Sequence, residues 1–178
     1  MPFSFPAKLT DCGAHAFDEL SYPGDSIKQE YKEDILVGYR WHDTKEIPAL
    51  FPFGHGLSYT TFTYGKPVAS AKAMAADGTL TVTVAVKNTG SIAGKEIVQL
   101  YVGDDKCSVL RPVKELKHFA KVGLAPGEEK SVTFTLTPDD LKFYDEASAA
   151  WKYEPGKFKA YVCASSADVR GVVSFEMQ

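Results

Sequence analysis

The carboxylate side chains are the first residues of this chain whose type could support catalysis. Two carboxylates held about 5–10 Å apart across a cleft can hydrolyse a glycosidic bond. Residues adjacent on a strand point to opposite faces, so two carboxylates that are neighbours in sequence do not form such a pair. We therefore predict no catalytic residue among the candidates, which are Glu33, Asp34, Asp43, Asp104, Asp105, Asp139, Asp140 and Asp145.

Histidine and cysteine side chains could bind a metal ion or act as nucleophiles. Cys12-Gly13-Ala14-His15 has one half of a zinc-like spacing, but no second half follows it. Cys107 and Cys163 could pair across a sandwich, but Cys107 falls in a predicted loop, and disulfides tolerate little variation in Cα separation. We expect no metal site, no cofactor and no disulfide framework, and we expect His55 to be packed or exposed rather than hydrogen-bonded across a junction.

Exposed aromatic side chains could bind a sugar by stacking on its ring. The candidates for such a platform are Trp41, Trp151 and Tyr153. Large aromatic residues of a β-sandwich mostly fill its core, and Trp151 stands on a predicted strand between alanine and lysine. We therefore expect Trp151 in the core, while the place of Trp41 stays open.

Composition excludes several classes of partner. The chain has 178 residues, of which 44% are hydrophobic and 24% charged, as in ordinary globular domains. The net charge is −3 and no basic run occurs, so neither nucleic acid nor an anionic membrane is an expected partner. No apolar run reaches the ~20 residues that a membrane helix needs. We expect a soluble protein, and its compartment stays open between cytoplasm, periplasm and secretion.

The stretch Leu50–Phe62 is irregular and rich in aromatic residues, with one proline and two glycines. Pro52 and the glycines on either side of His55 disfavour both helix and regular strand. Apolar side chains on such a segment need a surface to cover them. We therefore predict a seam between two bodies of structure, formed by Phe51, Phe53, Gly54, His55, Gly56, Leu57, Tyr59 and Phe62.

The segment before this seam, residues 1–49, is rich in turns and contains one convincing apolar run, Ile35–Trp41. The run resembles a strand buried on both faces. Such a strand needs neighbours on both sides, and fewer than fifty residues do not supply them. We predict that its sheet partners are absent, and that its exposed edge either folds back on the sandwich or promotes a homodimer through residues 35–41.

The chain after the seam shows the two-residue period of strands. Leu80 to Val86 and Val132 to Leu136 alternate between apolar and small or polar side chains, and Thr137 precedes a proline and two aspartates as at a helix start. About seven short strands at spacings of about 8–12 residues predict an all-β, immunoglobulin-like sandwich. We expect an N-terminal extension at residues 1–49, a linker at 50–65 and the sandwich at 66–178.

Ordered motifs along nearly the whole chain resemble family 3 glycoside hydrolases, the family of β-glucosidases and β-xylosidases. Tyr31–Asp43 resembles the last strand region of that family's α/β-sandwich domain, and Leu50–Phe62 resembles its linker. The remaining motifs resemble its fibronectin type III-like domain, including a first hairpin: Val86–Gly90, Gly94–Val102, Arg111–Lys117, Leu124–Glu128 and Glu154–Gly156.

The resemblance implies a parent protein that hydrolyses β-linked glucosides or xylosides by a retaining mechanism with two carboxylates. No residue here matches the family's nucleophile or its acid/base motif, so the chain is expected to be inactive alone. Its expected role is to brace the missing N-terminal catalytic domains through the seam. Two alternatives stay open: a free-standing carbohydrate-binding module, and a protein-interaction or adhesion domain.

Overall fold

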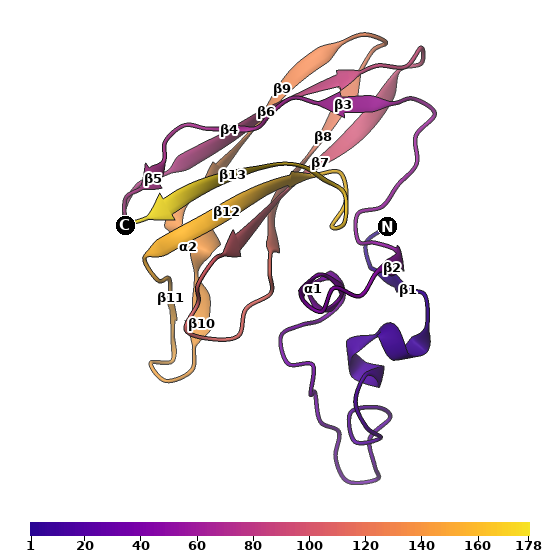
Figure 1. Ribbon diagram of the computed structural model, residues 1–178, viewed down its shortest axis with the longest axis vertical. Coiled ribbons are helices and arrows are strands. Elements are labelled where there is room, and N and C mark those ends of the chain that lie inside the picture. Colours follow the sequence, from indigo (N-terminus) through magenta and orange to yellow (C-terminus); the bar gives the residue numbers. More distant parts are fainter.

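Strands are the main regular structure of the chain. The computed structural model describes residues 1–178, and Figure 1 shows a β-sandwich with the N-terminal segment, drawn in indigo and purple, beside it. The predicted all-β sandwich with a loop-rich N-terminal extension is confirmed. No helix is both long and apolar enough to cross a lipid bilayer.

The larger sheet of the sandwich has five strands in the order β5-β13-β12-β7-β8. Its neighbours are antiparallel except β13 and β5, which run parallel. Its strands are β5 (Ala73–Met74), β7 (Gly94–Asp104), β8 (Glu115–Leu124), β12 (Gly156–Cys163) and β13 (Val169–Met177). β7 is therefore an inner strand of this sheet, with β12 on one side and the edge strand β8 on the other.

The facing sheet is built on β6 (Leu80–Asn88). β9 (Glu129–Leu136) pairs with one side of β6, and the short β3 (Phe62–Tyr64) and β4 (Val68–Ala69) pair with the other. The predicted alternation is confirmed, because Leu80, Val82, Val84 and Val86 are at most 1% exposed while the residues between them are not fully buried. These side chains belong to a cluster of 18 buried residues that forms one core between the sheets.

The connection from β6 to β7 corrects the expected hairpin, because the two strands lie in opposite sheets. Residues 89–93 cross the end of the sandwich. The buried Asn88 stabilises this crossing: its amide nitrogen donates to the carbonyls of Ile92 (2.8 Å) and Leu124 (3.1 Å), and its amide oxygen accepts from the Thr60 hydroxyl (2.6 Å). A buried amide with these partners holds strands of both sheets together at one end.

A short helix and a hairpin follow β9. Helix α2 (Pro138–Leu141) is capped by Thr137 as predicted, and the Thr137 amide donates to the Asp140 carboxylate at 2.8 Å. Strands β10 (Phe143–Asp145) and β11 (Ala150–Lys152) then form a two-stranded hairpin that projects from the sandwich in Figure 1. This hairpin carries Trp151.

The N-terminal segment has little regular structure. It contains β1 (Phe5–Pro6), the 3-10 turns η1 (Leu9–Asp11) and η2 (Gly13–His15), α1 (Tyr39–Thr44) and β2 (Ala49–Phe51), and β1 pairs with β2.

The predicted strand Ile35–Trp41 is wrong: turns cover residues 32–35, and α1 begins at Tyr39. Gly38, at φ 62°, turns the chain, and its carbonyl accepts from the backbone amides of Trp41 and His42. Trp41 is buried against Phe17, with ring centroids 5.7 Å apart, and its indole nitrogen donates to the Asp11 carbonyl. The run thus buries Leu36 and Trp41 by a turn and a helix instead of by pairing with neighbouring strands, and it leaves Ile35 and Val37 exposed.

Candidate functional site

The outward face of β7 shows that a second body covers the sandwich. A strand of an isolated sandwich buries one face and exposes the other. In β7 the inward Val98 and Leu100 are fully buried, but the outward Gln99 and Tyr101 are also buried, at 3% and 0% exposed. The covering body is the N-terminal segment, whose helix α1 lies beside this region in Figure 1.

Tyr39, the first residue of α1, provides the central contact of this interface. Its ring meets Tyr101 edge-on at 5.5 Å between centroids and lies 5.1 Å from the ring of Phe53. Its hydroxyl accepts a hydrogen bond from the backbone amide of Leu116 at 2.8 Å. One side chain therefore contacts β7, β8 and the seam together.

The end of α1 adds a buried ion pair. The Asp43 carboxylate lies 2.6 Å from the Lys114 ammonium, and the two side chains are only 12% and 9% exposed. The Thr44 hydroxyl accepts from the Val113 amide at 3.1 Å, so α1 also holds the loop that leads into β8. Burial raises the pKa of Asp43, although the Lys114 ammonium opposes this shift.

The polar groups beneath the interface are paired with each other. Gln99 donates from its side chain to the Ala164 carbonyl at 2.9 Å and accepts from the Tyr101 hydroxyl at 2.6 Å. Cys163 lies opposite Gln99 on β12, and burial raises the pKa of its thiol to about 12, which makes it a poor nucleophile. Cys163 and Cys107 are both free, so the disulfide left open by the sequence is not formed.

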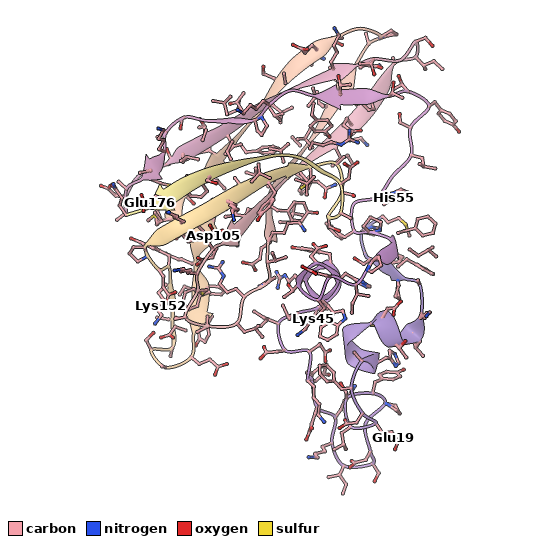
Figure 2. The ribbon with its side chains drawn as sticks, viewed as in Figure 1. Glu19, Lys45, His55, Asp105, Lys152 and Glu176 are labelled. Carbon is pink, nitrogen blue, oxygen red and sulfur yellow. The ribbon has the colours of Figure 1, made fainter.

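The seam joins the two bodies through its backbone. Phe53 accepts from the Ser166 amide at 2.8 Å, and Gly54 donates to the Met1 carbonyl at 2.7 Å. Gly54 has φ +80° and lies against the Gln99 side chain, whereas Gly56 has no neighbour within 4 Å of the place a Cβ would occupy. His55, labelled in Figure 2 at this junction, has its ring 5.5 Å from that of Phe51.

The second half of the seam is exposed, which corrects the expectation that its apolar side chains are all covered. Leu57 and Tyr59 are 94% and 97% exposed, whereas Phe62 in β3 is half-buried against the core. Residues 54–62 form one wall of a groove of about 600 Å³, whose other wall comes from residues 95–97 and 164–170. Leu57 and Tyr59 are thus left almost fully uncovered by the rest of this chain.

The three candidates for a sugar-binding platform differ in their exposure to solvent. Trp41 is buried and Tyr153 is half-buried against the core. Trp151 is 65% exposed, so the expectation that it fills the core is wrong. It packs edge-on against Tyr144 at 5.7 Å on the projecting hairpin, and Tyr144 is itself 50% exposed. Phe143 at the base of the hairpin is buried, but the β10–β11 pair projects from the sandwich and leaves Trp151 and Tyr144 exposed.

Sequence reasoning missed one cluster of reactive groups. Asp104, Cys107 and Glu154 bring ligand atoms within 4.8 Å of one another. This cluster does not line the groove at residues 54–62, and of the predicted carboxylate candidates only Asp43 borders a second groove, of about 260 Å³. No local sequence signal locates the cluster, because it forms only when the end of β7 pairs with the start of β12.

Comparison with known proteins identifies similar sequences over nearly the whole chain. A family model described as a fibronectin type III-like domain matches residues 96–166. Beta-glucosidase BoGH3A of Bacteroides ovatus is 66% identical over 176 residues, which are 99% of this chain and 24% of that protein. Thermostable beta-glucosidase B of Acetivibrio thermocellus is 49% identical over 166 residues, 93% of this chain and 22% of its own length.

Solved structures agree with these relatives. The β-glucosidase DesR from Streptomyces venezuelae, in complex with D-glucose, matches with a TM-score of 0.88 and 40% identity over 99% of this chain and 22% of its own. A GH3 β-glucosidase from Bifidobacterium adolescentis matches with a TM-score of 0.88 and 33% identity over 98% of this chain and 25% of its own. The chain thus spans about a quarter or less of the length of these proteins.

Proposed function

This chain corresponds to the C-terminal part of family 3 β-glucosidases, including their fibronectin type III-like domain, and we propose that it is a non-catalytic brace for the catalytic domains of such an enzyme. The proposed division is an end of the α/β-sandwich domain at residues 1–49, a linker at 50–65 and the fibronectin type III-like domain at 66–178. The proposed substrates of the parent are β-linked glucosides or xylosides, and no step of that chemistry is assigned to this chain.

One observation carries this proposal: the N-terminal segment buries the outward face of β7. Helix α1 reaches that face through the Tyr39 hydrogen bond to Leu116 and the buried ion pair of Asp43 and Lys114. Separating α1 from the sandwich would leave a buried charge without its partner, which is costly. The ion pair therefore holds the two parts in one orientation. A segment held in this way can transmit the position of the sandwich to a domain that precedes it.

The exposed surface of the N-terminal segment supports the same proposal. Large apolar side chains are exposed along it: Phe3, Phe5, Leu9, Phe17, Tyr22, Ile27, Tyr31, Ile35 and Val37. Monomeric proteins rarely expose large contiguous apolar patches, and such surfaces mark protein interfaces. The proposed occupant is the remainder of the parent protein, which accounts for about three quarters of the length of the relatives.

Complementation of a truncated relative tests the proposal. Beta-glucosidase BoGH3A lacking its counterpart of this chain would be co-expressed with the 178-residue chain, and hydrolysis of an aryl β-glucoside would be measured. We expect no turnover by either part alone and turnover by the pair. A turnover by the chain alone that a single Asp or Glu substitution abolishes would contradict the non-catalytic role. Failure of the two parts to associate would contradict the brace.

A carbohydrate-binding module is the second candidate, favoured by the exposed pair of Trp151 and Tyr144. Calorimetric titration of the chain with xylan, cellulose and oligosaccharides tests this candidate. We expect binding that is lost in Trp151→Ala and retained in Val68→Ala, a change at a similarly exposed side chain on β4. Heat signals that are absent at millimolar ligand, or equal in the two variants, would exclude this candidate.

Homodimerisation is a competing use of the N-terminal surface. The strand edge expected at residues 35–41 does not exist, so a dimer would have to use exposed side chains such as Ile35 and Val37. Sedimentation velocity over a range of concentrations tests this directly. A dimer that dissociates in Val37→Ser would support self-association, whereas a monomer at all concentrations would leave the surface to the parent protein.

A further inference from the structure

Three groups that bind metal ions converge where β7 ends and β12 begins. Asp104 is the last residue of β7, Cys107 lies in the loop after it, and Glu154 lies between β11 and β12. Their ligand atoms lie within 4.8 Å of one another. Asp105 and Lys152, both labelled in Figure 2, lie next to this cluster in sequence and mark the two segments that meet there.

The backbone holds these segments together. The Asp105 amide donates to the Lys157 carbonyl at 3.0 Å, which continues the pairing of β7 with β12. The Ser108 amide donates to one Glu154 oxygen at 2.9 Å, and the Ser108 hydroxyl donates to the other. Both segments are thus positioned without the help of any ligand.

One oxygen of the cluster is buried without a hydrogen bond. The Asp104 side chain is 2% exposed, and its Oδ1 accepts from the Lys106 amide at 3.0 Å, but its Oδ2 has no donor. The Arg111 guanidinium lies 3.5 Å from this oxygen, but its hydrogen bonds go elsewhere, to the Leu141 carbonyl at 3.0 Å and to Glu115 at 2.9 Å. A buried carboxylate oxygen without a donor is costly unless a proton or a cation satisfies it.

We propose that Asp104, Cys107 and Glu154 bind a divalent cation of the zinc type. Zn²⁺ takes thiolate and carboxylate ligands together, whereas Mg²⁺ and Ca²⁺ prefer oxygen alone. Two carboxylates and a thiolate carry three negative charges, which the ion and the nearby Arg111 guanidinium offset. A solvent molecule completes four-coordination, and the Cys107 thiol releases its proton to solvent when the ion binds.

The geometry requires only a small adjustment. Tetrahedral Zn²⁺ with its usual bond lengths holds S and O ligand atoms about 3.5–3.7 Å apart. The present atoms are at most 4.8 Å apart, so the loop and the Glu154 side chain would close on the ion by about 1 Å or slightly more. The bound ion would link the loop to the start of β12. The same loop leads to Val113 and Lys114, which hold α1, so ion binding would stabilise the interface as well.

Titration of the metal-free 178-residue chain with Co²⁺ or Cd²⁺ tests the site, because a thiolate ligand produces a charge-transfer absorption band. We expect one equivalent to bind with this band, and Zn²⁺ to displace it. At Zn²⁺ one hundred times its Kd, the Tm should rise by about 5–10 °C. Cys107→Ser should abolish the band and reduce affinity more than tenfold, and Glu154→Gln should weaken binding while keeping the band.

The matched control is Cys12→Ser, which removes a free, partly exposed cysteine outside the cluster and should leave the band and the affinity unchanged. Circular dichroism of each metal-free variant establishes that it is folded. A band that survives in Cys107→Ser, a band lost in Cys12→Ser, or Zn²⁺ that leaves the Tm unchanged would overturn the proposal. A band without any effect of Glu154→Gln would overturn the three-ligand site.

Discussion

Gly54 stands where the linker presses on the sandwich, and its replacement by alanine is expected to lower the free energy of unfolding by about 3 kcal/mol. The left-handed φ of +80° costs a residue with a Cβ roughly 1–2 kcal/mol. The new Cβ would also lie 2.5 Å from Oε1 and 2.8 Å from Cδ of Gln99. Gln99 cannot move aside freely, because its amide holds Ala164 and Tyr101, and each of those buried hydrogen bonds contributes about 1 kcal/mol.

Urea unfolding followed by circular dichroism measures this loss, and Gly56→Ala is the matched control. Gly56 has no left-handed φ and no neighbour that a Cβ would meet, so its replacement should stabilise slightly, by less than about 1 kcal/mol. In a Gln99→Ala background the clash disappears, so Gly54→Ala should cost only the roughly 1–2 kcal/mol of backbone strain. Equal losses at Gly54 and Gly56, or no relief in the Gln99→Ala background, would refute this reasoning.

Three further predictions concern the interface, the end of the sandwich and the exposed linker. Asp43→Asn leaves the Lys114 ammonium, whose side chain is 9% exposed, without a counter-charge and should cost about 3 kcal/mol in urea titration; a loss below about 1 kcal/mol would contradict it. Burial raises the pKa of the Glu96 carboxyl above its ordinary 4.5. The folded chain therefore keeps the Glu96 proton to a higher pH than the unfolded chain does. As a result, the free energy of unfolding falls as the pH rises from 4.5 through the raised pKa. Glu96→Gln should reduce this fall, measured as the change of the urea midpoint with pH. An unchanged dependence on pH would show that other groups cause the fall. Leu57→Ser combined with Tyr59→Ser should leave unfolding unchanged within about 0.5 kcal/mol, because these side chains are 94% and 97% exposed, yet it should weaken complementation of truncated BoGH3A; full complementation would place the docking surface elsewhere.

The strands of the sandwich were predictable because their signal is local. In β6 and β9 the apolar residues recur every second position, and the two-residue period of a strand places them all on one face whatever the partner strand is. The start of α2 was predictable for the same reason, since Thr137 and Asp140 lie within one turn of each other.

The run Ile35–Trp41 shows where a local pattern is insufficient. An apolar run of this length is compatible with a buried strand and with a short buried helix, and periodicity alone does not distinguish them. The structure uses Gly38 to turn the chain and buries Trp41 against the N-terminal segment. The choice depends on contacts with residues more than twenty positions away, such as Phe17 and Asp11.

Burial of particular side chains also depended on the tertiary structure. Trp151 stands on a strand, but its hairpin projects from the sandwich and leaves it exposed. Gln99 and Tyr101 stand on an outward face that a sandwich alone would expose, but the N-terminal segment covers them. A strand pattern specifies which side chains share a face, and it does not specify whether another body lies against that face.

The sequence by itself determined the all-β sandwich, the helix start at Thr137 and the resemblance to family 3 glycoside hydrolases. Only the tertiary structure revealed the crossing between β6 and β7, the interface of α1 with the outward face of β7, and the meeting of Asp104, Cys107 and Glu154. The physical reason is the distance along the chain over which each effect acts. Side-chain periodicity and turn chemistry result from backbone geometry over a few residues, whereas pairing and cover result from contacts between segments that only the folded chain brings together.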